Sequence, residues 1–486
     1  MPFLKLASSR RPLAEGENPL TLFERVRNRS AFLLQSSDGG VKGGYSFIGY
    51  DPFAKLWSSK GVTHLLKLKD FFDWEKSPVQ IFDGEPLEVL RELTRHFRFN
   101  GKSPVPFCGG AAGYFSYDFG AGLGGVQQKV FDDQELPDFV FFFADKIFAV
   151  DHEKSELCCI ALAPTDAEAQ RKLEEMADDL QVLPAFVQAG TVGSIEAQLT
   201  YDQYVQKLSI IHDYLKEGDT YQVNFSQRFS AECSRDPWSV YKNLAAVNPA
   251  PYSCFFDCED FQIISSSPEL LLSKTGSKVV TKPIKGTVPR GKNKKEDAQN
   301  VEKLLASEKD AAELAMIVDL ERNDLGKVCD PGSVRVVEPF SLKTASSLRS
   351  EYRTIEKYAR VIHTVSTIEG RLLHSKDFFD AFAALFPGGS ITGCPKKRTM
   401  EIIDELEDFR RGVYTGSAGY VGFDGNGAMN ILIRTMLLQN NKLLYQAGGG
   451  IVIDSDPRQE YEECFSKAKA LREALENHEN VIKFKE

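Results

Sequence analysis

Long apolar runs, paired cysteines and an excess of positive charge are all missing from this sequence. No apolar run reaches the roughly 18 residues that a membrane-spanning helix needs, and the opening residues, MPFLKLASSRRPLAEGE, contain no apolar core of signal-peptide length. The nine cysteines stand at irregular positions without a CxxC or a histidine-paired spacing, which argues against a disulfide framework and a zinc site. We therefore expect a cytoplasmic protein with reduced thiols and no membrane partner.

The balance of charge narrows the range of partners. The chain has 59 lysines and arginines against 69 aspartates and glutamates, which gives a formal net charge of −10. Such a surface disfavours binding to nucleic acid or to an anionic membrane. A small anionic substrate would therefore need a local basic pocket or a metal ion.

The pattern of apolar residues indicates a mixed architecture. At 486 residues the chain exceeds one typical domain, yet neither a repeat nor a low-complexity tract interrupts it. Short β-rich runs with glycine turns come first, and a helical pattern over residues 166–181 follows them. After a helix start at Thr200, long helices, one of them predicted over residues 300–320, alternate with short strands. We predict an α+β body of mixed sheets sandwiched by helices, with an N-terminal lobe (1–190) and a C-terminal lobe (191–486).

Two helical segments carry carboxylates in line with an apolar face. Glu313 lies on such a face, one turn after Asp310. The last helical segment repeats the arrangement with Glu460, Glu463 and Lys467 on one side. Two acid-bearing helices that face one cavity could hold Mg²⁺ through carboxylate oxygens. Salt bridges on a helix surface would produce the same spacing.

Glycine-rich segments and one lysine suggest further chemistry. FPGGSITGCPKKR, which contains Thr392, and QAGGGIV, which contains Gly448 and Gly449, are predicted as turns whose backbone N–H groups can approach an anion. Neither has the spacing of a nucleotide-binding loop, and ordinary tight turns look the same. In VVTKPIKGTVPRG, Lys285 follows a β-branched strand, where desolvation would make it a nucleophile. A solvated lysine is the ordinary alternative.

Taken together, these segments follow an order that resembles one family. The order is PIKGT, SEKDAAELAMIVDLERNDLG, IHTVSTIEG, FPGGSITGCPKKRTMEIIDELE, GSAGY, IRT, AGGGIV and EYEECFSK. It resembles the chorismate-utilising enzymes, which include anthranilate synthase component I, aminodeoxychorismate synthase component I, isochorismate synthase and salicylate synthase. FLLQSS and GGYSFIG extend the likeness toward the N-terminus. The resemblance implies the fold of anthranilate synthase component I and chorismate as substrate.

The same resemblance implies a role for each motif residue. Glu313 and Glu463 match the Mg²⁺-binding glutamates, and Asp310 and Glu460 match neighbours that act through water. The catalytic matches are Lys285 as nucleophile, Glu269 in SSSPE as general acid, His363 and Thr392. The groups that match the holders of the substrate carboxylates are Tyr414, Arg434, Gly448, Gly449 and Lys467.

A tryptophan pocket is the last implied site. The matching residues are Leu34, Ser36, Tyr45, Pro251 and Tyr252. Gln35 and Gly44 depart from the pattern of the tryptophan-inhibited members. The stretch 341–353 resembles an insertion, and no role follows for it.

Two positions distinguish the members of this family. Lysine at position 285 and Asn224 are typical of the aminodeoxychorismate synthases, which supply p-aminobenzoate and folate, whereas anthranilate synthases usually carry alanine and an apolar residue there. The chain has no GxCxGxQ-like amidotransferase segment, so the resemblance implies a glutamine amidotransferase subunit as the source of ammonia. The alternatives are an anthranilate synthase component I and a non-catalytic subunit that binds tryptophan or chorismate.

Overall fold

The computed structural model describes residues 3–37, 44–69, 79–99, 102–182, 190–337, 353–358 and 360–476. The predicted insertion at 341–353 lies outside these ranges except for its last residue. Within these ranges, no helix is long and apolar enough to cross a membrane.

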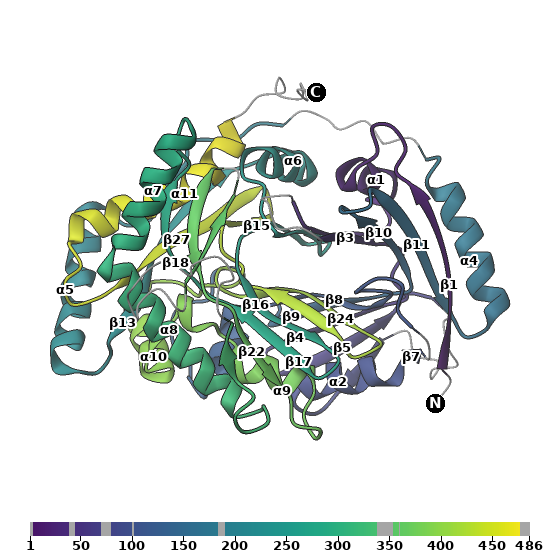
Figure 1. Ribbon diagram of the computed structural model, residues 1–486, viewed down its shortest axis with the longest axis horizontal. Coiled ribbons are helices and arrows are strands. Elements are labelled where there is room, and N and C mark those ends of the chain that lie inside the picture. Colours follow the sequence, from purple (N-terminus) through teal and green to yellow (C-terminus); the bar gives the residue numbers. More distant parts are fainter. Residues whose placement is uncertain are drawn as a thin grey trace.

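Two large sheets lie face to face at the centre of the molecule (Figure 1). Among the described residues the first is a 13-stranded sheet, in which β23 pairs with β13 beside the main order β12-β13-β27-β26-β15-β14-β2-β3-β10-β11-β1-β7. Its strands are β1 (Phe3–Pro12), β2 (Phe32–Gln35), β3 (Tyr45–Gly49), β7 (Arg98–Phe99), β10 (Lys146–Asp151), β11 (Glu156–Ala163), β12 (Glu196–Ala197), β13 (Gln222–Glu232), β14 (Tyr252–Asp257), β15 (Phe261–Ser267), β23 (Gly393–Cys394), β26 (Thr435–Gln439) and β27 (Lys442–Ile451).

The second sheet has, in the described part of the chain, the 11-strand order β19-β22-β17-β16-β25-β24-β8-β9-β4-β5-β6. Its strands are β4 (Ala54–Ser59), β5 (Val62–Lys67), β6 (Val79–Phe82), β8 (Gly110–Phe115), β9 (Phe139–Ala144), β16 (Leu270–Thr275), β17 (Lys278–Lys282), β19 (Arg335–Val336), β22 (Ile368–Arg371), β24 (Ser417–Gly422) and β25 (Gly427–Asn430). A small sheet joins β18 (Ile284–Pro289), β21 (Val361–Val365) and β20 (Thr354–Lys357).

Helices cover the outer faces of both sheets (Figure 1). They are α1 (Pro19–Val26), α2 (Pro86–His96), α3 (Tyr117–Leu123), α4 (Asp166–Asp179), α5 (Tyr201–Glu217), α6 (Pro237–Val247), α7 (Lys294–Ala306), α8 (Glu308–Gly326), α9 (Phe378–Leu385), α10 (Lys396–Leu406) and α11 (Pro457–Glu476), with a 3₁₀ turn, η1 (Gly389–Ile391). Helices α1, α4, α6 and α11 contact the first sheet, whereas α2, α8 and α9 contact the second.

The main core fills the space between the two sheets. The apolar run FVFFFA of β9 is buried throughout, as expected for a strand covered on both faces. Aromatic rings cross from one sheet to the other: Phe47 of β3 lies edge-on to Tyr420 of β24, with ring centroids 5.6 Å apart. A second apolar cluster lies between the first sheet and its outer helices. The predicted α+β architecture with mixed sheets sandwiched by helices is confirmed.

The helix predicted over residues 300–320 is wrong in one respect, because the structure divides it at Ser307. This residue ends α7 and begins α8, where its hydroxyl accepts a hydrogen bond from the Asp310 N–H at 3.2 Å. A serine side chain satisfies a free N–H at a helix start better than it fits a helix interior, so it favours a new helix here. Glu313 therefore lies near the start of α8 and not in the middle of a longer helix.

Both large sheets combine strands from the two sides of residue 190. In the first sheet, β2 lies between β14 and β3, and in the second sheet β8 pairs with β24. Residue 190 lies in the connection between α4 and β12. The two-lobe division at this position stays a prediction.

Candidate active site

Lys285 lies in β18 and points into the interior between β27 and α8. Its side chain is only 12% exposed, and its Nζ is 3.8 Å from Oε2 of Glu313. Burial lowers the pKa of the Lys285 ammonium, and nearby Lys467 lowers it further, although Glu313 opposes both. The sequence pattern placed this lysine at a strand end, and the structure makes it a buried amine beside a carboxylate.

Glu269 lies on the short connection between β15 and β16 and contacts β18, the strand that carries Lys285. One of its carboxylate oxygens accepts a hydrogen bond from the N–H of Ile284, the residue before Lys285, at 3.2 Å. Burial raises the pKa of Glu269 to about 6. A carboxyl group with this pKa keeps a protonated fraction near neutral pH, which a general acid requires. The structure therefore brings the predicted acid and the predicted nucleophile together.

His363 extends this group from the neighbouring strand β21. Its Nδ1 lies 2.8 Å from the hydroxyl of Thr287 in β18, and its ring is 5.3 Å from the ring of Tyr358. Burial, with Arg434 nearby, lowers the pKa of His363 to about 3. The imidazole is therefore neutral at physiological pH, so it can exchange hydrogen bonds with a ligand but adds no charge.

The four predicted metal-binding carboxylates lie on the first two turns of α8 and α11. Lys309 bridges the two helices, because its Nζ is 3.6 Å from Oε1 of Glu460 and 4.0 Å from Oε1 of Glu313. Glu463 pairs with Lys467 at 2.6 Å. Asp310 lies against Gly286, where an added Cβ would be 3.1 Å from the Asp310 Cγ.

Electrostatics differ between two of these carboxylates. Burial raises the pKa of Glu313, although Lys285 and Lys309 oppose it. For Glu463 burial acts in the same direction, but Lys467 outweighs it and the pKa is lowered. Glu313 and Glu460, whose side chains are largely buried, need a cation nearby, because an uncompensated buried charge costs several kcal/mol.

These carboxylates fit a divalent cation by their chemistry and their surroundings. Carboxylate oxygens are the ligands that Mg²⁺ prefers. Two of them come together at Gly449, because a Cβ there would lie 2.8 Å from Oε2 of Glu460 and 3.5 Å from Oε1 of Glu463, so the absence of a side chain lets both carboxylates approach β27. Among the described residues, no three acidic, histidine or cysteine side chains form a ready-made metal cluster. Lys309 lies between Glu313 and Glu460 instead, and Lys467 pairs with Glu463.

The glycines of QAGGGIV are not a turn, which corrects the prediction. They lie in β27, where Gly448, Gly449 and Gly450 pair with residues of β13. A Cβ at Gly448 would lie 2.3 Å from a backbone oxygen of β13, and one at Gly450 would lie 2.9 Å from the Gln222 side chain and 3.1 Å from Nζ of Lys285. The glycines therefore bring a strand close to polar side chains, which explains their presence without a turn.

Three of the predicted carboxylate-holding groups border this space. Lys467 donates a hydrogen bond to the carbonyl of Gly448 at 2.9 Å. Arg434 has a left-handed backbone (φ 54°), and burial lowers the pKa of its guanidinium. Tyr414 is buried, with its ring 5.5 Å from the guanidinium carbon of Arg411. Within the described residues no ion pair is formed by Arg434, so a partly buried cation is available to an anion.

Sequence reasoning missed Gln222 and Arg411. Both polar atoms of the buried Gln222 amide, Oδ1 of Asn224 and Oγ1 of Thr364 have no hydrogen-bond partner in the described structure. Thr364 pairs with Lys285, and Gln222 lies against Gly450. Unpaired buried polar atoms are costly, so a group of them indicates a binding site. An amide within a strand has no spacing motif that would reveal it.

Arg411 links β13 to the turn that contains Thr392. It donates hydrogen bonds to the carbonyls of Asn224 and Ile391, at 2.7 and 3.0 Å, and pairs with Glu407. Ile391 precedes Thr392, whose hydroxyl donates to the Gly388 carbonyl at 2.9 Å. Thr392 is thus held within its own turn.

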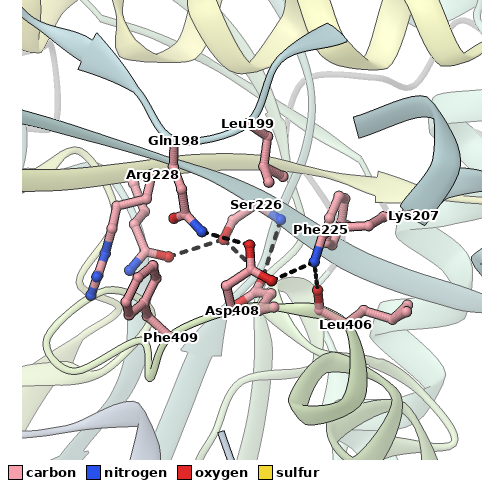
Figure 2. Close-up of a pocket in the computed structure, with 11 residues that line it drawn as sticks. Gln198, Leu199, Lys207, Phe225, Ser226, Arg228, Leu406, Asp408 and Phe409 are labelled. Carbon is pink, nitrogen blue, oxygen red and sulfur yellow. Dashed lines mark hydrogen bonds and ion pairs between the residues drawn. The ribbon is translucent and has the colours of Figure 1, made fainter. Parts of the chain in front are cut away.

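A small cavity lies beyond this ion pair, at the edge of β13 (Figure 2). Its volume is about 10 Å³, enough for one water molecule. Ser226 donates to Glu407 at 2.8 Å, and Lys207 donates to Asp408 at 2.7 Å. This space is too small for a chorismate-sized ligand and lies apart from Lys285.

The five predicted tryptophan-pocket residues gather on neighbouring strands of the first sheet. Leu34 of β2 pairs with Cys254 of β14, and Ser36 follows β2. The Tyr45 hydroxyl donates to Asp151 at 2.9 Å. The remaining two, Pro251 and Tyr252, lie at the start of β14, where Asn430 donates to the Tyr252 carbonyl at 2.8 Å. The structure brings these residues together; their binding of tryptophan stays a prediction.

Comparisons with known proteins identify the family of the chain. The model of the chorismate binding enzyme family matches residues 29–473. The chain is 41% identical to aminodeoxychorismate synthase component 1 of Bacillus subtilis over 93% of each chain. It is 36% identical to anthranilate synthase component 1 of Thermus thermophilus over 96% of each chain.

Solved structures give the same result. Anthranilate synthase component I of Streptococcus pneumoniae superposes with a TM-score of 0.76 at 31% identity, covering 89% of this chain and 93% of that one. The menaquinone-specific isochorismate synthase MenF of Escherichia coli shares the fold, with a TM-score of 0.70 at 17% identity, over 98% of this chain and 95% of that one. By its family match, its relatives and its fold, the chain belongs to the chorismate-binding enzymes.

Proposed function

We propose that the chain is an aminodeoxychorismate synthase component I. It would convert chorismate and ammonia to 4-amino-4-deoxychorismate, a precursor of p-aminobenzoate and folate, with Mg²⁺ and a glutamine amidotransferase subunit as partner. The observation that carries this proposal is the buried Lys285, placed between the Glu269 connection and the carboxylates of α8. The relative at 41% identity, which bears this name, supports it.

Substrate binding would use the cations that border the site. Arg434 and Lys467 are positioned to hold carboxylates of chorismate, with Tyr414 beside them. The unpaired Nε2 of Gln222 could donate a further hydrogen bond to the substrate. A dianionic substrate suits this group of positive charges in an otherwise acidic protein.

The chemistry would begin at Lys285. Its neutral amine attacks C2 of chorismate, the ring double bonds shift, and the C4–O bond breaks as Glu269 gives its proton to the leaving hydroxyl, which departs as water. Ammonia then attacks C4 and gives a proton to the Glu269 carboxylate, the double bonds shift back, and the amine of Lys285 leaves C2. The sum is chorismate plus ammonia to 4-amino-4-deoxychorismate plus water, with the enolpyruvyl group retained.

Glu313 and Glu463 would hold Mg²⁺ directly, with Asp310 and Glu460 in water-mediated positions. When bound, Mg²⁺ would attract the ring carboxylate of chorismate and, by engaging Glu313, reduce the negative charge that keeps Lys285 protonated.

The product decides between this function and its alternatives. We expect chorismate, Mg²⁺ and an ammonium salt to yield a product whose mass retains the enolpyruvyl group. Relatives named anthranilate synthase component 1, at 36% identity, make that activity the second candidate. Fluorescent anthranilate with released pyruvate would establish the second candidate, and the absence of turnover would leave a binding subunit.

The nitrogen source provides an independent prediction. Since no amidotransferase segment occurs in the sequence, the purified chain should use ammonium but not glutamine. Addition of a glutamine amidotransferase subunit should restore glutamine-dependent turnover. Coupled assays with each nitrogen source, before and after that addition, measure this. Glutamine-dependent product from the chain alone would contradict the proposal.

The substitution Gly450→Ala should slow turnover without unfolding the protein. The new Cβ would lie 3.1 Å from Nζ of Lys285, and a reacting group displaced by a fraction of an ångström costs roughly tenfold to a hundredfold in rate. The control is Gly122→Ala, because an added Cβ at Gly122 meets nothing within 4 Å. Measurements of kcat with ammonium and of Tm for both variants test this. An unchanged kcat for Gly450→Ala would show that Lys285 does not need this space.

A further inference from the structure

Lys309 occupies an unusual place among the carboxylates of the proposed site. It lies in the first turn of α8, yet its ammonium reaches α11, with Nζ 3.6 Å from Oε1 of Glu460 and 4.0 Å from Oε1 of Glu313. Its side chain is 54% exposed, whereas those of Glu313 and Glu460 are 14% and 5% exposed. One solvent-accessible cation therefore contacts two largely buried acids on different helices.

The other lysines of this group are placed differently. Lys285 is buried in β18, and Lys467 is held by Glu463 on its own helix and by the Gly448 carbonyl. Neither connects α8 to α11 through carboxylates. Lys309 makes both of its contacts from the solvent side, so it can leave them by rotating into water, with little cost beyond the two ion pairs.

The carboxylates would repel each other without this cation. Glu313 and Glu460 both face Lys309, and Glu460 keeps a second contact with the hydroxyl of Ser455 at 2.7 Å. Because Gly449 has no side chain, the carboxylates of Glu460 and Glu463 both come close to the same backbone position of β27 and so lie near each other. A divalent cation cannot share oxygens with an ammonium at these distances, because the two positive charges would repel.

We propose that Lys309 is a built-in counter-ion that holds Glu313 and Glu460 in the metal-free enzyme and must be displaced when Mg²⁺ binds. The inference rests on the proposed Mg²⁺ site. Lys309 would thereby weaken metal binding while stabilising the empty site. Mg²⁺ binding would release its ammonium to solvent.

Calorimetric titration with Mg²⁺, without chorismate, tests this directly. Lys309→Met should bind Mg²⁺ about tenfold more tightly than wild type, the order expected when two half-exposed ion pairs no longer compete. Lys309→Arg keeps the charge and should resemble wild type. The matched control is Lys303→Met, which removes the same charge from an exposed position on α7.

Thermal unfolding provides a second measurement. In the absence of Mg²⁺, Lys309→Met should have a lower Tm than wild type, and added Mg²⁺ should raise the Tm of Lys309→Met by more than it raises the Tm of wild type.

A site-specific readout accompanies the titration. Reductive methylation of Lys309, followed by peptide mass spectrometry, should become faster in wild type when Mg²⁺ is added, while Lys303 stays unchanged. If wild type binds Mg²⁺ and Lys309→Met binds it no more tightly, the inference is wrong while the metal site stands. If neither protein binds Mg²⁺, both are wrong. Turnover with ammonium, assayed on the same preparations, reports on the proposed amination separately.

Discussion

Lys285→Ala should lose formation of the C4-aminated product by on the order of a thousandfold or more, the scale for removing a covalent nucleophile. Binding of chorismate should persist, because Arg434 and Lys467 remain. With C2 unoccupied, residual amination should shift toward C2. Lys285→Arg should not restore activity, because the guanidinium keeps its charge and cannot readily deprotonate.

Product analysis of both variants with ammonium measures this effect. The control is Lys278→Ala, which removes an exposed lysine of β17 that pairs with Glu369. Wild type incubated with chorismate without ammonia should also show a lysine-linked adduct by intact mass. A rate near wild type for Lys285→Ala would reduce this residue to an electrostatic role.

Glu463→Gln should reduce turnover by at least roughly a thousandfold, because a metal ligand supplies several kcal/mol of stabilisation to developing charge. The amide keeps the shape of the side chain but removes the negative charge that pairs with Lys467 in this structure and that Mg²⁺ would need. Excess chelator should reduce the turnover of wild type to the same extent. Added Mg²⁺ should restore the turnover of chelator-treated wild type but not that of Glu463→Gln.

Glu462→Gln is the matched control for this prediction. Glu462 is the preceding residue on α11, is 63% exposed and pairs with Arg458 at the surface. Steady-state rates at several Mg²⁺ concentrations separate the two variants. If Glu463→Gln kept full activity, or if chelator left wild type unaffected, this carboxylate would not be a metal ligand.

Much of the fold follows from pattern alone. The helix over residues 166–181 and the helix after Thr200 agree with their predicted places, because apolar periodicity and capping act locally. The division of the helix at Ser307 does not follow from the pattern, since a single serine within a helical pattern is compatible with either a cap or a helix interior. The pairing of distant strands depends on tertiary contacts that no local pattern records.

The candidate site shows the same limit. Residues within motifs, such as Lys285, Glu269 and His363, were identified through the order of the motifs, and the structure brings them together. The sequence pattern predicts a turn at the glycines of β27, which lie in a strand, because the absence of a Cβ serves close packing as readily as a turn. Gln222 stands out only once its burial and its unpaired amide are known.

The interleaving of the sheets also bears on how the chain matures. The strand β13 pairs with β27, which is synthesised much later and lies shortly before the C-terminal helix. In the same way, one edge of β2 has no partner until β14 has been synthesised. During synthesis, these early strands must wait with open edges, and such edges are prone to pair with other chains. Folding should therefore be governed by late, long-range pairing and be slow compared with that of a helical protein of similar length.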